Sequence, residues 1–152
     1  MSLNFKDFKH LVRISGTDIR GDKHAINGLC HIRGIGPRMS DIILKKAQIP
    51  PITYIGLLSE DQVNKLDEII KDPIKFGIPK WFVNHQKERI TGEDIHITSS
   101  TLALYDRNDI DRLKKLRSYR GVKHAVGHKV RGQRTKSTGR GGRSMGVSRK
   151  KV

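Results

Sequence analysis

The sequence contains a single cysteine, Cys30, among its 152 residues. An internal disulfide and a cysteine-rich zinc site are therefore excluded. The sequence also has no apolar run near the roughly 20 residues that are needed to cross a bilayer. Its first residues mix charges instead of forming the long apolar stretch of a signal peptide. We therefore expect a protein of a reducing, cytoplasmic compartment.

Acidic residues are missing from the C-terminal part of the chain. Residues 117–152 hold twelve Lys or Arg and no Asp or Glu, out of 31 basic residues in all. The first 116 residues hold 19 basic and 15 acidic side chains, a net charge of only +4 against +16 for the whole chain. Because its charges repel one another and little apolar surface is available, such an arm becomes ordered only on a polyanion.

Nucleic acid is the polyanion that this arm fits best. A membrane surface would require a row of large apolar side chains at helical spacing, which the arm lacks. On nucleic acid, each neutralised phosphate releases condensed counterions, and this release favours binding. A tail that merely keeps the protein in solution is the alternative, and the density of Arg argues against it.

Apolar residues at helical spacing predict short helices in the first half of the chain. A short extended segment within residues 5–19, ending in a turn near Gly21, precedes them. The first helix is expected over residues 23–33, with Asp22 as its N-cap and Gly34 directly after its end. Its expected buried face consists of Ala25, Ile26, Leu29 and Ile32.

Two further helices carry clear start signals. The second is expected over residues 37–48, because Pro37 suits the first helical position. The third opens at Ser59, which forms a capping box with Gln62, and the pair at positions 72–73 closes it. Their expected buried residues are Met39, Ile42, Ile43 and Ala47, then Val63, Leu66, Ile69 and Ile70.

The second half of the chain is less regular. Residues 74–100 show no periodicity, and a fourth, longer helix is predicted over residues 101–119. An ion pair between Asp111 and Lys115 would support this helix, and Gly121 would follow its end. Its expected apolar stripe is Leu102, Tyr105, Ile110, Leu113 and Leu116. Beyond it, Gly, Ser and Thr without periodicity are typical of an extended arm.

These elements predict a mainly α protein with four parts. A small helical head with a helix-hairpin-helix-like turn covers residues 1–73, and an irregular insert covers residues 74–100. The long helix covers residues 101–120, and an extended basic RNA-binding tail covers residues 121–152.

The segment that joins the first two helices has a composition suited to phosphate. Gly34 and Gly36, followed by a helix N-terminus, would present several unpaired backbone N–H groups and the positive end of the helix dipole. Arg33 and Arg38 would reinforce the site, and Ile35 would pack inward. The pattern resembles the helix-hairpin-helix motif of DNA repair and replication proteins. The alternative is a tight turn between two helices in which the glycines only allow the backbone conformation and bind no ligand. This alternative explains the same residues equally well.

No catalytic constellation is visible in the sequence. Asp106, Asp109 and Asp111 lie close together, but their Lys and Arg neighbours favour a solvated helix face over a metal-dependent nuclease. His124 and His128 have a spacing that can chelate zinc, yet no further soft ligand is near, so contact with phosphate or a base is favoured. We therefore expect no enzyme, no metal, no cofactor and no small-molecule substrate.

Aromatic side chains offer a second way to hold RNA. Trp81 and Phe82 could stack on bases, but their apolar neighbours favour a small satellite core. Tyr119, which lies between two arginines, is the better stacking candidate. Cys30 is interpreted as a small buried hydrophobe.

The chain resembles a known family over nearly its whole length, the universal small-subunit ribosomal protein thirteen family in its archaeal and eukaryotic form. The motifs that carry the resemblance are Arg13-Ile14-Ser15-Gly16-Thr17-Asp18-Ile19, Gly34-Ile35-Gly36, Leu58-Ser59-Glu60, Tyr119-Arg120-Gly121-Val122-Lys123-His124 and Val130-Arg131-Gly132-Gln133-Arg134-Thr135-Lys136. The last run is the most specific. The stretch at positions 78–84 and the ending at positions 146–151 resemble the archaeal and eukaryotic branch.

This resemblance implies a structural component of the small-subunit head. It implies binding to the 3′ domain of small-subunit rRNA, pairing with small-subunit protein nineteen, and bridges to large-subunit protein five and large-subunit rRNA. It also implies a tail that reaches tRNA. The implied rRNA contacts are Arg117, Tyr119, Arg120, Lys123, His124, Arg131, Gln133, Arg134, Thr135 and Lys136. The implied tRNA contacts are Arg140, Arg143, Arg149, Lys150 and Lys151.

Two other functions remain open from the residues alone. The glycine turn by itself would permit a helix-hairpin-helix DNA-binding or repair enzyme, which would also need a catalytic constellation. The tail by itself would permit a nonspecific nucleic-acid chaperone, which would not need the specific head.

Overall fold

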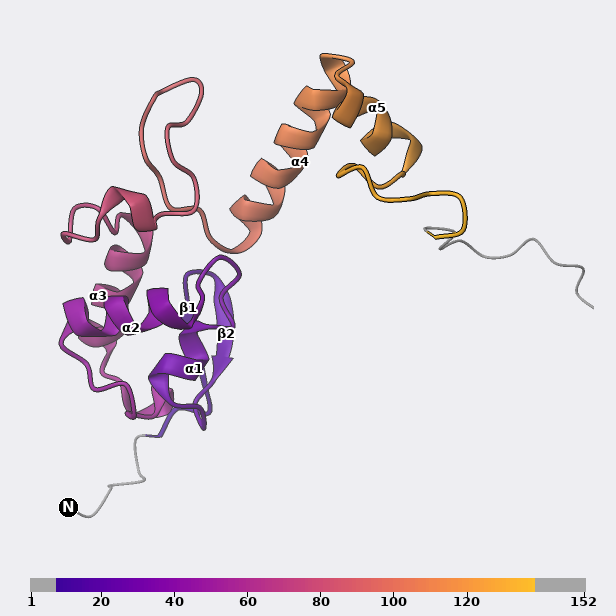
Figure 1. Cartoon of the computed structure of the whole chain (residues 1–152). Helices are drawn as coiled ribbons and strands as arrows, with labels where there is room; N and C mark the ends of the chain where they lie inside the picture. The colour runs from indigo at the N-terminus through magenta and orange to yellow at the C-terminus, as the bar shows by residue number, and fades with distance from the viewer. Residues whose placement is uncertain (1–7, 139–152) are drawn as a thin grey trace, which may run out of the picture. The chain divides into compact units, whose positions relative to one another are not determined.

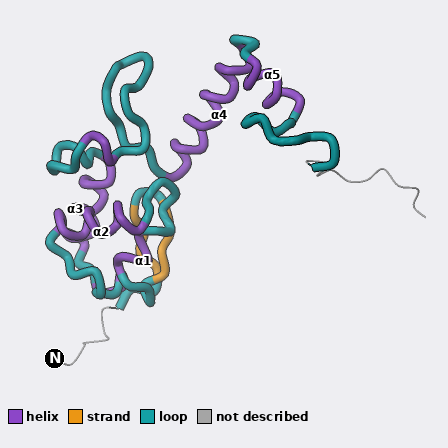
Figure 2. The backbone as a smooth tube through the Cα atoms, viewed as in Figure 1, coloured by secondary structure: helices purple, strands orange, loops and turns teal. Residues whose placement is uncertain are grey.

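A computed structural model describes residues 8–138 of the chain (Figure 1). The chain forms two compact units, Met1–Leu104 and Tyr105–Val152. The elements are β1 (Leu11–Ile14), β2 (Thr17–Arg20), α1 (Ala25–Leu29), α2 (Pro37–Ala47), the 3₁₀ turn η2 (Ile55–Leu57), α3 (Glu60–Lys71), the 3₁₀ turn η3 (Lys80–Phe82), α4 (Ser99–Lys115) and α5 (Tyr119–Val126). Figure 2 shows that helices and loops dominate and that strands are confined to one small hairpin. The mainly α prediction is confirmed.

The predicted extended segment is a two-stranded hairpin. β1 and β2 pair antiparallel, with Val12 opposite Ile19. Ser15 and Gly16 form the turn, and both have positive φ, of 48° and 73°. Two successive positive φ angles give the turn the twist that antiparallel strands favour. The buried residues Val12, Ile14 and Ile19 then face one side, toward the helices.

The first helix is shorter than the sequence predicts, and its predicted cap is wrong. α1 ends at Leu29, and its N-cap is His24, whose side chain makes no capping hydrogen bond. Asp22 instead accepts a hydrogen bond from Nη2 of Arg20, at 2.6 Å, because an arginine two residues away competes for its carboxylate. After Leu29 the backbone continues through i, i+3 bonds, and Ile32 is still fully buried.

The next two helices match the prediction closely. α2 has Pro37 at its first position and ends before Gln48, which is left-handed with φ of 62°. The capping box of α3 is present: Gln62 N donates to Ser59 Oγ at 3.3 Å, and Ser59 N donates to Gln62 Oε1 at 3.1 Å. Leu66, Ile69 and Ile70 of α3 are buried as expected.

One hydrophobic core unites the hairpin, α1, α2, α3 and part of the insert. Ile78 belongs to this core, and Phe82 packs against it. Asn84 fastens the end of the insert, because Ile97 N donates to its Oδ1 at 2.9 Å and its Nδ2 donates to Ile97 O at 2.6 Å. The prediction of a satellite core is wrong: Phe82 packs against the main core instead, and Trp81 is 72% exposed. Cys30, predicted to be buried, is only half-buried.

The second unit corrects the predicted long helix. α4 ends at Lys115, and α5 begins at Tyr119, after a break in which Arg117 has φ of 50°. Gly121 lies inside α5 and does not follow the end of α4. The predicted Asp111–Lys115 pair is absent from the described residues, where Asp111 instead contacts Lys114 at 3.3 Å.

Gly121 explains how α5 lies against α4. A Cβ at this position would lie 2.0 Å from Leu113 O and 2.8 Å from Lys114 N, so only glycine allows this approach. Ser118 closes the corner: its Oγ donates to Leu113 O at 3.1 Å and accepts from Gly121 N at 3.1 Å. Sequence reading took the glycine as a helix end because glycine is a poor helix former.

Candidate nucleic-acid interface

α5 carries an exposed aromatic ring and several cationic side chains. Tyr119 is 71% exposed, and Nζ of Lys123 lies over its ring, 5.3 Å from the centroid. Arg120 is exposed, while Lys123 and His124 are half-buried. A cation above an aromatic face stiffens the ring without covering it fully. The structure therefore brings together four of the predicted rRNA contacts on a single helix.

The same helix also exposes apolar side chains. Val122 and Val126 are 50% and 62% exposed, and with Tyr119 they stand at i, i+3 and i+7. Leu116 of the preceding corner is exposed as well. α5 is thus amphipathic, whereas sequence reading assigned this stretch to an arm without periodicity. The spacing of residues 119, 122 and 126 does indicate an amphipathic helix. The glycine at position 121 argued against a helix there, because glycine is a poor helix former.

The segment after α5 is held by local hydrogen bonds. Gly127 ends the helix in a left-handed conformation, and His128 N donates to Lys123 O at 2.9 Å. Arg131 N donates to Gln133 Oε1 at 3.1 Å, so the side chain of Gln133 already has one partner within the chain.

The predicted contacts of this segment lie on its surface. The exposed ones are Arg131, Gln133, Arg134, Thr135 and Lys136. The predicted tRNA contacts Arg140, Arg143, Arg149, Lys150 and Lys151 lie outside the described residues.

The Gly34–Gly36 turn is closed on one side and open on the other. Gly34 has φ of 100°, and a Cβ there would lie 2.7 Å from Ile97 O. Ser99 N donates to Arg33 O at 2.7 Å on the same side. At Gly36, the N-cap of α2, a Cβ would meet nothing within 4 Å. The turn therefore has room for a ligand at Gly36 and none at Gly34.

The backbone donors of this turn are fewer than the sequence suggests. Ile35 is buried, as expected, and its N–H donates to Ile32 O at 3.0 Å. Arg33 and Arg38 are both exposed. The first turn of α2 has no side-chain cap, so the positive end of the helix dipole is not offset by a capping side chain there.

The acidic residues of α4 form ordinary surface pairs. Asp111 Oδ1 lies 3.3 Å from Lys114 Nζ, and Asp109 Oδ1 lies 3.9 Å from Arg112 Nε. Over residues 8–138, no group of three or more His, Cys, Asp or Glu could hold a metal ion. In the same range, no helix has the length and apolarity that a membrane crossing requires.

A cationic, amphipathic helix with an exposed tyrosine is typical of a nucleic-acid-binding protein. In this chain that helix belongs to the second unit, and a small helical core forms the first. The description of the family model that matches residues 13–141 is ribosomal protein S13/S18. The chain is 46% identical over 145 residues to small ribosomal subunit protein uS13 of Methanocaldococcus jannaschii, covering 95% of this chain and 97% of that protein. It is 45% identical over 146 residues to the uS13 protein of Methanothermobacter thermautotrophicus, covering 96% and 98%.

The chain belongs to the ribosomal protein S13/S18 family. It is therefore a structural component of the small ribosomal subunit, and its family is not enzymatic. The resemblance found in the motifs is confirmed, and with it the expectation that the chain is no enzyme. The repair-enzyme alternative is thereby set aside.

Proposed function

We propose that the chain binds small-subunit rRNA mainly through α5 and the basic residues that follow this helix. The observation that carries this proposal is the run of twelve cations without a carboxylate over residues 117–152, part of which α5 presents beside exposed Tyr119. The cations neutralise phosphates, and Tyr119 stacks on a base that is not paired. In this proposal the rRNA contacts are those on α5 and on residues 131–136.

The glycine turn serves as a second, weaker contact. One backbone phosphate would lie at the open Gly36 side, held by the N-terminus of α2 with Arg33 and Arg38. A phosphate contact of this kind positions the protein and reads no sequence. The packing of Ile97 against Gly34 supports this role, because it fixes the turn before any ligand arrives.

Finer roles follow from the family resemblance. We propose pairing with small-subunit protein nineteen, bridges to large-subunit protein five and large-subunit rRNA, and contact of the last basic residues with tRNA. The proposed location is the cytoplasm, on the ribosome. The Gly- and Arg-rich end of the sequence supports the tRNA role, since an extended chain of the last 21 residues spans about 65 Å at roughly 3.3 Å per residue.

Truncation after Arg117 tests the main proposal. It removes eleven of the twelve cations together with α5, while the core of the first unit remains intact. Binding to a transcript of the small-subunit 3′ domain should weaken strongly, and its dependence on salt should flatten. Each lost phosphate contact lowers the slope of log K against log salt by about 0.7 to 0.9.

A double variant, Arg33→Gln with Arg38→Gln, is the comparison. It should weaken binding less than the truncation does and lower the slope by about two at most. A truncated protein that kept both its affinity and its salt slope would contradict the proposal. Equal losses in the two proteins would show that the glycine turn is as important as the second unit.

A further inference from the structure

Trp81 is held at the surface although its neighbours are buried. It is 72% exposed, while Ile78 and Val83 are 2% and 4% exposed. Phe82 packs against the hydrophobic core, and its ring meets the Trp81 ring edge-on, with 5.3 Å between the centroids. A large aromatic side chain left in water forgoes the free energy of its burial. A binding role would explain why the turn keeps it there.

The turn that carries Trp81 is fixed in place. Phe82 N donates to Pro79 O at 3.0 Å, closing η3. The side-chain amide of Gln86 donates to Trp81 O at 2.8 Å, which ties the turn to the following segment. Because the backbone of Trp81 is held from both sides, a ligand that covers the ring would lose little conformational entropy of the protein on binding.

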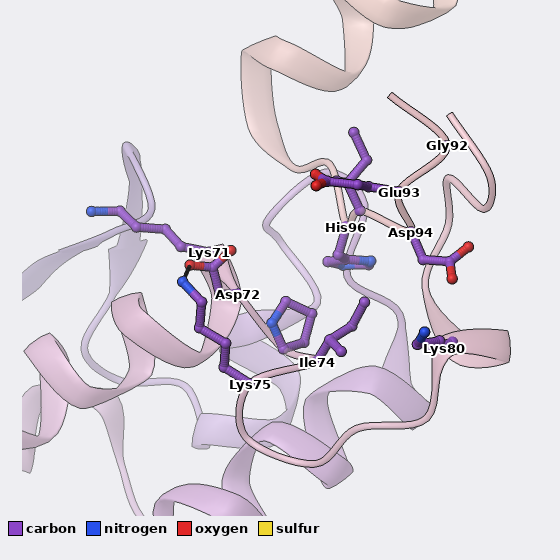
Figure 3. A pocket seen from close by; sticks show the side chains of 11 residues that line it. Lys71, Asp72, Ile74, Lys75, Lys80, Gly92, Glu93, Asp94 and His96 are labelled. Carbon is purple, nitrogen blue, oxygen red and sulfur yellow. Dashed lines mark hydrogen bonds and ion pairs between the residues drawn. The ribbon is translucent and has the colours of Figure 1, made fainter. Parts of the chain in front are cut away.

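The surface next to η3 is charged and hollowed. A hollow of about 420 Å³ lies between the end of α3, η3 and the strand-like segment of the insert (Figure 3). Lys75 at its rim is neutralised by Asp72, with Nζ and Oδ2 2.6 Å apart. Asp94 accepts a hydrogen bond from Lys87 N at 2.8 Å. Lys80 is exposed and forms no ion pair with any of residues 8–138, so its charge remains available for a ligand.

The interior of the hollow is less suited to an anion than its rim. Glu93 projects across it and would repel a phosphate. His96 lines the hollow, but its Nε2 is closed off from solvent and has no partner among the described residues, so a ligand cannot reach it in this conformation. A phosphate would therefore lie at Lys80, directly beside Trp81.

We propose that Trp81 is a stacking platform for an unpaired RNA base and that Lys80 neutralises the adjoining phosphate. This inference rests on the proposed function, since it adds a further RNA contact on the first unit to those of the basic residues and the glycine turn. Tryptophan also anchors protein interfaces, so the charge of its neighbours decides between the two kinds of partner. The residue before it in the turn is a lysine, and single aromatics among cations are typical of single-stranded RNA sites.

The chain carries its own probe for this contact, because Trp81 is its only tryptophan. The fluorescence of the full-length protein would be followed while an oligoadenylate of roughly 12 nucleotides is added. Stacking on a base should quench the emission. A fully paired RNA duplex of the same length, which offers phosphates but no free base, should bind through the basic residues without comparable quenching.

Substitutions then separate the parts of the contact. Both Trp81 variants lack the tryptophan, so their binding is followed by the anisotropy of a dye-labelled oligoadenylate. Trp81→Ala should weaken this binding by roughly 5- to 150-fold, and Trp81→Phe should retain most of the affinity, because a phenyl ring still stacks. Ile90→Ala is the matched control, since Ile90 is 84% exposed on the same insert and has no proposed role. Lys80→Gln should lower the salt slope by about one, whereas Lys75→Gln should leave it unchanged, because Asp72 already neutralises Lys75.

Two results would overturn this inference. The first is a Trp81→Ala protein that binds as tightly as the unaltered chain. The second is a blue-shifted, stronger emission in assembled small subunits, which would show Trp81 in an apolar protein pocket. Neither result would touch the main proposal, which fails only if the full-length chain does not bind the small-subunit transcript at all.

Discussion

Replacement of Gly121 by alanine isolates the corner between α4 and α5. On propensity alone, alanine inside a helix stabilises it by about 1 kcal/mol relative to glycine. Here the added Cβ would lie 2.0 Å from Leu113 O, a backbone atom that cannot rotate away. Overpacking of this kind costs about 1–3 kcal/mol or more. We therefore expect α5 to separate from α4, with a net loss of local stability.

Hydrogen exchange of the backbone amides measures this loss directly. The amides of residues 119–126 should exchange faster in Gly121→Ala, while those of the first unit should be unchanged, because its hydrophobic core does not include this corner. Val122→Ala is the control: it changes the adjacent, half-exposed residue of the same helix without adding an atom. Equal or greater protection of α5 in Gly121→Ala would refute the steric argument and show that helix propensity prevails.

Three further predictions concern the first unit. Burial lowers the pKa of His96 from its ordinary 6.5, so the unfolded chain takes up the proton at a higher pH than the folded chain does. The free energy of unfolding should therefore be flat above about pH 6.5 and fall below it. Urea titrations of His96→Gln should show a weaker fall. Ile43→Ala should lower the free energy of unfolding by about 2–5 kcal/mol, because Ile43 is fully buried. As a control, Ile52→Ala at an exposed position should change it by less than about 0.5 kcal/mol. Denaturant titration measures the free energy of unfolding of both variants. Ser59→Ala removes the cap of α3 and should cost about 0.5–2 kcal/mol in the same titration, against almost nothing for exposed Ser100→Ala.

Sequence periodicity predicted the elements whose start signals are local. Pro37 and the Ser59–Gln62 pair act within one helical turn, so α2 and α3 begin where expected. Their buried faces follow the 3.6-residue period, which packing against a single core preserves. The hairpin was predicted only as a short extended segment. The turn at Ser15 and Gly16, with its two positive φ angles, resembles any other polar turn in sequence.

The failures share one physical cause, a contact between residues distant along the chain or across a corner. Gly121 lies within a helix that packs closely against Leu113 O, where a larger residue would not fit. Helix propensities and end signals describe neighbouring residues only, so they do not predict this contact. Trp81 is exposed while Phe82 packs inward, and an apolar run does not tell which of two adjacent aromatics faces the core. Asp22 is the exception, because Arg20, which draws its carboxylate away from the expected capping role, lies only two positions earlier in the chain.

The closure of the Gly34 turn has a consequence for the order in which the first unit folds. The bonds that close it join Ser99 to Arg33, and Ser99 Oγ to Ser15 O at 2.8 Å, across most of the unit's sequence. The hairpin, α1, α2 and α3 can pack before residue 97 exists, because their contacts lie within residues 8–71. During synthesis, therefore, the turn stays uncovered until Ile97 and Ser99 leave the ribosome that makes them. Contacts that close long loops form late in folding. The Gly34 turn is therefore covered and rigid only in chains whose translation has passed the insert.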